Sequence, residues 1–307
     1  MLNPNVVILM GTYNGQRHLN EQLDSICAQT HSNWELWVSD DGSNDNTCQI
    51  LQDFQNRFKD RVFIHAGPRK GFAANFLSLV CKKNLAGTYY AYSDQDDIWQ
   101  PNKLQQALDW FNTVPAEKPA LYCARTKIVN EQGHEIGYSP LFKKNPGFLN
   151  ALIQNIGGGN TMVFNHAVLK LLREAGEEIS IVAHDWWTYM VVTGAGGEVF
   201  YDSQPMLDYR QHGNNLIGVN SGWCARLGRI SLLFKGRFKT WNNSNFIALE
   251  SIKHRLTDKN KQVLTDLNQA RQCGLLSRMI KLQRIGIYRQ TFLGNIGLTA
   301  AAFFNKI

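Results

Sequence analysis

Short apolar runs alternate with amphipathic segments over the first 125 residues. Val6–Met10 is continuously apolar, which is typical of a strand buried on both faces of a parallel sheet. Leu19, Leu23 and Ile26 then recur at helical spacing, so a helix is expected next. The same reasoning predicts strands at Trp34–Val38, Val62–His65, Tyr89–Ser93 and Leu121–Ala124, and helices at Ile50–Phe58, Phe72–Leu85 and Pro101–Phe111. This alternation predicts an α/β fold with a mostly parallel sheet covered by helices.

Polar clusters follow three of the predicted strands. They are residues 11–15 (Gly-Thr-Tyr-Asn-Gly), 39–43 (Ser-Asp-Asp-Gly-Ser) and 94–97 (Asp-Gln-Asp-Asp). Each cluster by itself fits a turn, because Asn, Asp, Gly and Ser are turn residues. However, ligands of parallel sheets bind outside the carboxyl ends of the strands. In the third cluster, three carboxylates within four residues repel one another unless a cation or a basic partner lies among them. A shared binding site is therefore expected.

The chemistry of these carboxylates favours a divalent cation and a diphosphate. Carboxylate oxygens without a neighbouring cysteine suit Mg2+ or Mn2+, and such ions commonly bridge a substrate diphosphate. The chain has no GxxxxGK[ST] phosphate loop. Residues 194–197 (Gly-Ala-Gly-Gly) lack the last glycine of the GxGxxG dinucleotide fingerprint. The interpretation that remains is a nucleotide diphosphate held through a metal ion on the aspartate cluster.

Further motifs carry candidate chemistry. Residues 183–187 (Ala-His-Asp-Trp-Trp) are expected to open a helix that continues through Val192. Asp185 could complement the helix dipole above two core tryptophans, or act as a general base beside an aromatic wall for a sugar. Residues 157–160 (Gly-Gly-Gly-Asn) could let the backbone approach a ligand, or form an ordinary loop. His212 gains significance only if the fold brings it to the aspartates.

Charge is unevenly distributed along the 307 residues. Residues 1–212 hold 17 Lys and Arg against 22 Asp and Glu, whereas residues 213–307 hold 15 against 3. A basic last third suggests a nucleic acid, an anionic membrane or an acidic partner. No nucleic-acid-binding motif is present there, so nucleic acid is not expected and a membrane surface is favoured. The apolar fraction of 44% and the charged fraction of 19% exclude a wholly disordered chain.

The basic last third carries one clear amphipathic pattern, at Leu275–Arg289. Around a helix there, four basic residues fall within an arc of about 140° and four apolar residues lie on the opposite side. They are Arg278, Lys281, Arg284 and Arg289, and Leu276, Met279, Ile280 and Ile287. Such a helix could lie at a membrane surface, or pack against the catalytic part or a second copy of the chain. The uncharged stretch near the C-terminus, Gln290–Asn305, has 16 residues, fewer than the roughly 20 apolar residues of a spanning helix, so no transmembrane segment is expected.

The cysteines and the N-terminus bear on the compartment. The six cysteines are at least 21 positions apart and form no CxxC pair, which argues against a cysteine zinc site or a thioredoxin-type centre. The N-terminus lacks the basic-then-apolar pattern of a secretory signal. A reducing, cytoplasmic location is therefore expected.

Taken together, these motifs resemble a family-2 glycosyltransferase of the GT-A fold. Five pieces match in order over roughly residues 5–215: residues 12–14 (Thr-Tyr-Asn), 40–45 (Asp-Asp-Gly-Ser-Asn-Asp), 71–75, 94–97 and 184–187 (His-Asp-Trp-Trp). The last two, with residues 209–213 (Tyr-Arg-Gln-His-Gly), are most similar to bacterial rhamnosyltransferases of polysaccharide assembly. The resemblance implies a catalytic domain over residues 1–218, with a nucleotide-sugar half to about residue 100 and an acceptor half over 101–218. The basic helical extension would cover residues 219–307.

The resemblance also implies roles for individual residues. Asp185 would be the catalytic base, Asp40 would read the edge of uracil or thymine, and Tyr13 would stack near the base. The nucleotide-binding set would be completed by Thr12, Asn14, Asp41, Gly71, Asn75, Asp94 and Gln95. The metal ligands would be Asp96 and His212, with Asp97 as a further candidate. The acceptor would contact His184, Trp186 and Trp187, although the family more commonly has Glu where this chain has His184.

The reaction that the resemblance implies is a single inverting displacement. Asp185 would remove the proton of an acceptor hydroxyl as it attacks the anomeric carbon, and Mn2+ or Mg2+ would stabilise the departing nucleoside diphosphate. The expected donor is dTDP-L-rhamnose, and the expected acceptor is a lipid-linked saccharide of surface polysaccharide (O antigen) synthesis, at the inner face of the cell membrane.

Two alternatives to this reaction remain open. One is a sugar-nucleotide nucleotidyltransferase, although residues 12–15 lack its Gly-rich, basic loop. The other is a catalytically silent carbohydrate-binding scaffold on the membrane, although all three acidic motifs are intact.

Overall fold

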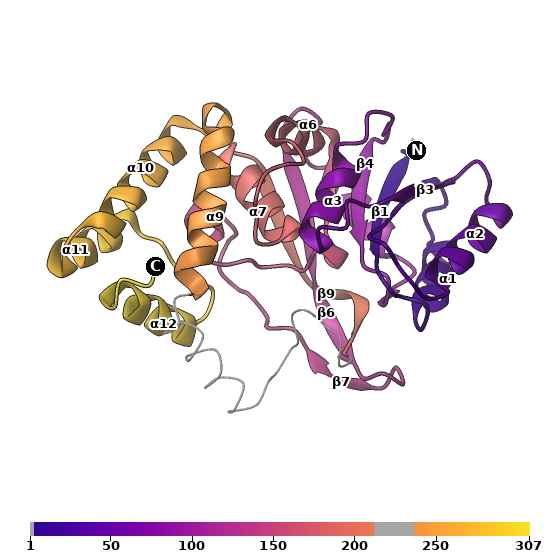
Figure 1. Ribbon diagram of the computed structural model, residues 1–307. Coiled ribbons are helices and arrows are strands. Elements are labelled where there is room, and N and C mark those ends of the chain that lie inside the picture. Colours follow the sequence, from indigo (N-terminus) through magenta and orange to yellow (C-terminus); the bar gives the residue numbers. More distant parts are fainter. Residues whose placement is uncertain (1–2, 212–236) are drawn as a thin grey trace.

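A mixed sheet forms the centre of the computed structural model, which describes residues 3–211 and 237–307 (Figure 1). Within these residues the sheet has nine strands. Its first half is parallel, in the order β3 (Val62–Ala66), β2 (Trp34–Asp40), β1 (Val6–Thr12) and β4 (Tyr89–Ser93). These four strands run in the same direction, so the loops that follow them lie along one edge. The parallel sheet predicted from the apolar runs is confirmed in this half.

The second half of the sheet mixes strand directions. β8 (Val163–Asn165) pairs antiparallel with β4 and with β6 (Ala120–Val129), and β6 pairs parallel with β9 (Glu198–Arg210). β7 (Glu135–Tyr138) pairs antiparallel with β6, and the two-residue β5 (Ile98–Trp99) pairs antiparallel with β9. The pairing of β5 with β9 brings the end of β9 next to residues 94–97, which immediately precede β5.

Helices cover both faces of the sheet (Figure 1). One layer contains α1 (Leu19–Cys27), α2 (Thr47–Arg57) and α4 (Lys103–Phe111), and the other contains α3 (Phe72–Val80), α6 (His166–Ala175) and α7 (His184–Gly194). β1 shows how one strand serves both layers, because successive side chains point to opposite faces. Ile8 and Met10 pack in the first layer, and Val7 and Leu9 pack in the second.

The apolar pattern overestimates one helix and misses two short ones. α3 ends at Val80, whereas the pattern predicted a helix to Leu85. Leu85 is buried all the same, because a turn carries it into the core, with its N–H directed to the carbonyl of Lys82 at 3.4 Å. The short α5 (Phe148–Ala151) and a 3-10 turn at Gly159–Thr161 were not predicted, since segments this short show no periodicity.

The C-terminal extension is helical, as expected, and it shares the core of the second layer. It contains α9 (Arg237–Ser251), a 3-10 turn (Lys253–Arg255), α10 (Asp258–Gln272), α11 (Leu275–Ile285) and α12 (Phe292–Phe303). Phe246 and Leu249 of α9 belong to the same buried cluster as α6 and α7. Asn260 Nδ2 donates hydrogen bonds to the carbonyls of Thr193 and Gly194 at the end of α7.

Part of the amphipathic pattern predicted at Leu275–Arg289 is wrong. Arg278 was expected on an exposed basic arc, but its side chain is buried. The helix also stops at Ile285, because Gly286 adopts a left-handed conformation with φ of 78°. Within the described ranges, no helix has the length and apolar character needed to cross a membrane.

Candidate active site

The first two polar clusters form one hydrogen-bonded unit around Asp40. Its Oδ1 accepts hydrogen bonds from the hydroxyls of Thr12 (2.9 Å) and Ser43 (2.5 Å). Its Oδ2 accepts from the backbone N–H groups of Ser43 (2.8 Å) and Gly42 (3.2 Å). Burial raises the pKa of Asp40, but the hydrogen bonds from Ser43, Thr12 and Gly42 outweigh burial and leave the pKa below its usual value.

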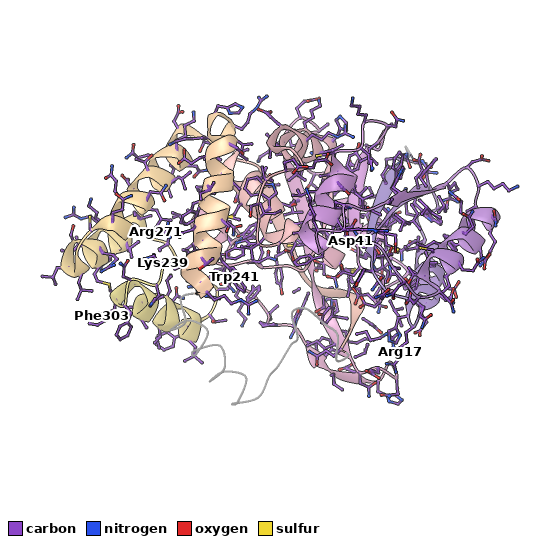
Figure 2. The ribbon with its side chains drawn as sticks, in the orientation of Figure 1. Arg17, Asp41, Lys239, Trp241, Arg271 and Phe303 are labelled. Atoms are coloured by element: carbon purple, nitrogen blue, oxygen red, sulfur yellow. The ribbon has the colours of Figure 1, made fainter. Side chains whose placement is uncertain are left out.

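These contacts give Asp40 a structural role. Its carboxylate organises the loop in this conformation. Its contact with the edge of a nucleobase remains a prediction. The neighbouring Asp41 (Figure 2) organises the following loop, because its carboxylate accepts from the N–H groups of Arg69 (2.6 Å) and Gly71 (2.8 Å).

Gln95 ties the third polar cluster to the first. Its Oε1 accepts from the N–H of Tyr13 (2.9 Å), and its Nε2 donates to the carbonyl of Tyr13 (3.0 Å). A Cβ at position 15 would lie 2.2 Å from Gln95 Oε1, so this close approach requires Gly15. The ring of Tyr13 is exposed at the edge of this unit, and its stacking on a base remains a prediction.

Three other predicted nucleotide-binding residues shape the same loops. Asn14 has a φ of 49°, and its N–H donates to Ser43 Oγ at 2.8 Å. Gly71 has a φ of 88°, a conformation that glycine adopts without strain. Asn75 is buried, and its Nδ2 donates to the carbonyl of Ser39 at 2.8 Å. These three residues shape the loops through their backbone or side chain, and their contacts with a nucleotide remain predictions.

Asp94, Asp96 and Asp185 form the acidic centre of the site. Asp94 and Asp96 follow β4, and Asp185 lies in the first turn of α7. Burial, together with the negative charges of Asp96 and Asp185, raises the pKa of Asp94 to about 8. The fold therefore brings these segments together, as the sequence predicted. Carboxylates that interact this strongly are stabilised by a shared proton or by a cation.

Asp97 lies next to this centre, and burial together with the negative charges of Asp96 and Asp94 raises its pKa. It is fully buried, where its Oδ2 accepts from Asn160 Nδ2 (2.5 Å) and its Oδ1 from the N–H of Arg210 (3.3 Å). Lys103 is also fully buried, with its Nζ 3.5 Å from the centre of the Trp99 ring. Burial lowers the pKa of Lys103 to about 7, although the charge of Asp97 opposes the shift. Asp97 is thus an internal anchor in this conformation, and its contact with a metal ion remains a prediction.

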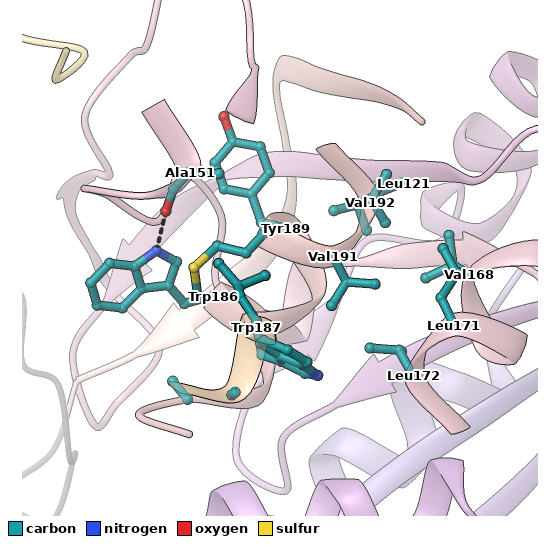
Figure 3. Packing of buried hydrophobic residues seen from close by; sticks show 14 of the residues in the cluster. Leu121, Ala151, Val168, Leu171, Leu172, Trp186, Trp187, Tyr189, Val191 and Val192 are labelled. Carbon is teal, nitrogen blue, oxygen red and sulfur yellow. Dashed lines mark hydrogen bonds between the residues drawn. The ribbon is translucent and has the colours of Figure 1, made fainter. Parts of the chain in front are cut away.

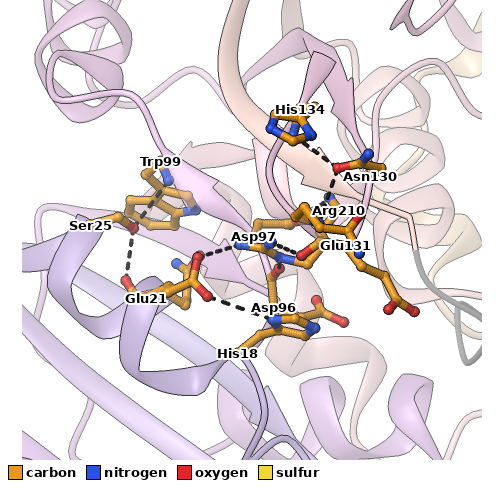
Figure 4. Close-up of polar contacts among 12 residues, drawn as sticks. His18, Glu21, Ser25, Asp96, Asp97, Trp99, Asn130, Glu131, His134 and Arg210 are labelled. Atoms are coloured by element: carbon orange, nitrogen blue, oxygen red, sulfur yellow. Dashed lines mark hydrogen bonds and ion pairs between the residues drawn. The ribbon is translucent and has the colours of Figure 1, made fainter. Parts of the chain in front are cut away.

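Arg210 is the functional residue that the sequence analysis missed. Its guanidinium is buried at the end of β9, where Nη2 forms an ion pair with Glu21 (2.5 Å) and Nη1 donates to the carbonyl of Glu131 (2.8 Å) (Figure 4). Its Nε donates to the carbonyl of Asp96 at 3.3 Å. These bonds fix the backbone of residues 96–97. In the sequence, its place in the segment at 209–213, two positions before His212, is the one sign of a role.

Asp185 has the properties of a general base. Its Oδ2 accepts from the N–H of Gly159 (3.1 Å) and its Oδ1 from the N–H of Trp186 (2.6 Å). Burial raises the pKa of Asp185 to about 6, although these backbone hydrogen bonds oppose the shift. A pKa near neutrality suits a group that must accept a proton during a reaction. The chemistry expected of Asp185 is therefore compatible with its surroundings.

The residues that flank Asp185 pack in the core, which corrects the predicted aromatic wall. Trp187 is fully buried, and Trp186 is buried with its Nε1 donating to the carbonyl of Ala151 at 2.6 Å (Figure 3). Neither ring offers an exposed face to a sugar. Of the two interpretations of residues 183–187, the structure shows the core position of the tryptophans. It also places Asp185 beside the acidic centre.

His184 is likewise part of the core. Its ring is buried and stacks on Phe76, with ring centres 3.8 Å apart. Burial lowers the pKa of His184 to about 3, so the ring is neutral. A Cβ at position 159 would lie 2.3 Å from His184 Nε2, which explains why the loop before Asn160 requires Gly159. His184 therefore supports the loop that donates to Asp185, and a direct contact with an acceptor is not available to it in this conformation.

The acidic centre fits a divalent cation. Mg2+ and similar ions are usually held by one or two carboxylates together with the phosphates of a substrate, and Asp94 and Asp96 can supply these carboxylates. Burial and the charges of Asp96 and Asp185 both disfavour the ionised form of Asp94, and a bound cation would stabilise that form. Within residues 3–211 and 237–307, no three His, Cys, Asp or Glu side chains are grouped so that they alone could hold a metal ion. His212, the other predicted ligand, lies outside the described residues.

Comparison with known proteins agrees with this geometry. The sequence pattern of the family described as Glycosyl transferase family 2 matches residues 7–173. Over 238 residues the chain is 29% identical to dTDP-rhamnosyl transferase RfbG of Shigella flexneri, which covers 73% of this chain and 78% of that protein.

Solved structures share the fold. S. aureus TarS 1–349, in complex with UDP-GlcNAc, matches with a TM-score of 0.57 at 16% identity, covering 98% of this chain and 89% of that chain. The mannosyltransferase PcManGT from Pyrobaculum calidifontis, in complex with GDP-Man and Mn2+, matches with a TM-score of 0.51 at 16% identity, covering 100% of this chain and 86% of that chain. These likenesses confirm the expected GT-A fold class.

Proposed function

The chain belongs to glycosyl transferase family 2, and on that premise we propose that it transfers a sugar from a nucleotide-diphosphate donor to a saccharide acceptor with inversion of configuration. The observation that carries the proposal is the position of Asp185, at the start of α7 and beside Asp94 and Asp96, with a pKa of about 6. A general base works best when its pKa lies near the working pH.

In the proposed mechanism Asp185 acts on the acceptor. The N–H groups of Gly159 and Trp186 fix the orientation of its carboxylate. The carboxylate accepts the proton of an acceptor hydroxyl while the hydroxyl oxygen attacks the anomeric carbon, and the bond from that carbon to the diphosphate breaks. A single displacement of this kind inverts the configuration. When bound at Asp96 and Asp94, Mn2+ or Mg2+ supplies Lewis-acid stabilisation of the departing diphosphate.

We further propose dTDP-L-rhamnose as the donor and a lipid-linked saccharide of surface polysaccharide assembly as the acceptor. The donor is supported by the Shigella flexneri relative and by the resemblance of residues 94–99 and 184–187 to rhamnosyltransferases. The acceptor is supported by the basic extension, which suits a protein that works at the cytoplasmic face of a membrane.

Release of nucleoside diphosphate tests the proposal. Purified protein with Mn2+ should slowly hydrolyse the correct nucleotide sugar, and a thermal-shift screen should identify the same donor, because a bound ligand stabilises the folded state by mass action. We expect dTDP-rhamnose to give the strongest response. Turnover of a UDP-hexose without turnover of dTDP-rhamnose would overturn the donor but not the enzyme class. Release from no donor would favour the catalytically silent scaffold.

A further inference from the structure

α12 is apolar on two faces, and only one of them is covered. The helix contains no charged residue. Leu298, Ala301 and Ala302 are buried against the rest of the protein. On the other side, Phe292, Leu293 and Ile296 are 80%, 66% and 51% exposed. We call these three residues, together with the exposed Phe303 and Phe304, the outer face of α12; Figure 2 shows Phe303 on the outside of the molecule. The helix also carries the polar Asn295 and Thr299, so it is apolar on these two sides and not all round. An exposed group of large apolar side chains of this kind marks a site of interaction.

The adjoining helix, α11, also exposes large apolar side chains. α11 contacts α12, and its Leu276 and Ile280, one helical turn apart, are 79% and 51% exposed. Isolated exposed apolar residues are normal in proteins, whereas several large ones on two adjoining helices indicate a site of interaction.

The charge around these helices selects the partner. Residues 267–307 contain six Lys and Arg and no Asp or Glu. Arg284 is exposed on α11, and Lys281 is partly exposed beside it. A two-fold contact between copies of this chain would bring the same basic residues together, which is unfavourable. An anionic lipid surface, in contrast, can bury apolar side chains in its interface and attract basic side chains to its phosphates.

We propose that the outer face of α12, with Leu276 and Ile280 of α11, inserts into the interface of an anionic lipid bilayer while Lys281 and Arg284 contact lipid phosphates. This inference builds on the membrane location in the proposed function and adds the surface that makes the contact. It differs from the pattern read in the sequence, since the buried Arg278 takes no part and an uncharged helix supplies most of the apolar contact.

Co-sedimentation of the full chain with vesicles tests the proposal. Vesicles of phosphatidylcholine with about 30% phosphatidylglycerol should bind the protein, vesicles of phosphatidylcholine alone should bind it weakly, and binding should decrease between about 0.1 and 0.5 M salt. The triple variant Phe292→Ala, Leu293→Ala, Ile296→Ala should bind at least about tenfold more weakly, because it removes most of the exposed apolar area of α12. Arg284→Glu should weaken binding to anionic vesicles only.

Ile247→Ala provides the matched control. Ile247 is 74% exposed on α9, outside the proposed surface, so its removal should leave vesicle binding unchanged. Absence of wild-type binding, or equal binding by the triple variant, would overturn the proposal. Light scattering without lipid tests the alternative of a dimer. If the wild-type protein were a dimer and the triple variant a monomer, a second copy of the chain would cover this face, and the proposal would be overturned. Metal-dependent donor hydrolysis without lipid reports the proposed activity separately, so failure of one proposal is distinguishable from failure of the other.

Discussion

The aspartates of this site differ through the groups that surround them. Four protein donors hold the pKa of Asp40 low despite its burial, whereas burial raises the pKa of Asp185 to about 6. Asp97 is enclosed by Asn160 and the backbone of Arg210. Aspartates of the same motifs therefore include a loop organiser, the proposed proton acceptor and an internal anchor, and the surrounding groups set these differences.

Asp185→Asn should keep nucleotide binding and lower turnover by roughly 10²–10⁴-fold, because Asn has nearly the same shape but cannot accept the proton. In the unmodified protein, turnover should decrease as the pH is lowered past about 6, because Asp185 can accept a proton only when it is deprotonated. Steady-state rates across this pH range and nucleotide titrations measure both effects. Asp109→Asn, at an exposed position of α4, should behave like the unmodified protein.

The size of the loss discriminates between candidate bases. A loss below about tenfold in Asp185→Asn would point to a different base. His184→Ala should lower turnover less than Asp185→Asn, because the neutral His184 ring only packs on Phe76 and supports Gly159. A larger loss of turnover in His184→Ala than in Asp185→Asn would contradict the assignment of Asp185 as the base.

Asp96→Ala should abolish metal-dependent nucleotide binding and raise the melting temperature of the metal-free protein near pH 7. The folded pKa of Asp94, about 8, lies above the unfolded value of about 3.9. The folded state therefore holds a proton that the unfolded state has lost, so stability falls as the pH rises between these two values. Removing the charge of Asp96 lowers the pKa of Asp94 and lessens this fall. Thermal unfolding with Mn2+ and with EDTA measures the effect, and nucleotide binding that is insensitive to EDTA would contradict the metal assignment.

At the scale of elements, the segment between β4 and β5 depends on β9. Arg210 at the end of β9 joins the carbonyl of Asp96, Glu21 of α1 and the carbonyl of Glu131. Asp97 is held on its other side by Asn160. The carboxylates of Asp94 and Asp96 are thus presented by a backbone that distant parts of the chain keep in position.

Arg210→Lys should raise the KM for the donor by about tenfold or more, because an ammonium cannot replace three directed hydrogen bonds and each bond to a charged group contributes about 1.5–3 kcal/mol. The matched control is Arg17→Lys, whose ion pair with Glu131 is exposed and contributes little. Kinetics with varied donor concentration and thermal unfolding separate positioning from stability. A lower melting temperature with an unchanged KM would assign Arg210 to stability alone.

Periodicity in the sequence predicted the elements that bury continuous apolar faces. β4 coincides with the predicted Tyr89–Ser93, and α7 begins at His184 as expected. The convergence of the polar clusters followed from strand direction. Arg210 was missed because its partners lie far away in the sequence, so no local pattern marks them. Arg278 was misassigned because periodicity gives the faces of a helix but not which face the rest of the molecule covers. The acceptor contact of Trp187 was implied by the family resemblance, and the alternative of a core position is the one that the structure shows.

At the scale of the whole molecule, the catalytic part and the extension share one core. Leu249 of α9 and Leu264 of α10 lie in the same buried cluster as Val191 of α7. Trp241 of α9 also packs edge-on against Trp186, with ring centres 6.4 Å apart. The extension therefore completes the burial of the helix that carries Asp185. A surface contact made by α12 is consequently connected, through this core, to the helix that carries Asp185.

Leu249→Ala should destabilise the catalytic part together with the extension. Leu249 is fully buried, so its truncation should lower the free energy of unfolding by about 2–5 kcal/mol. Ile247→Ala, two positions away and exposed, should change that free energy by less than about 0.5 kcal/mol. Because the core is shared, loss of helical signal in circular dichroism and loss of nucleotide binding should occur in one coincident transition for both variants. Two separate unfolding transitions would contradict this expectation. If Leu249→Ala shifted only one of them, and nucleotide binding were lost in the other, the extension would be an independently folding domain.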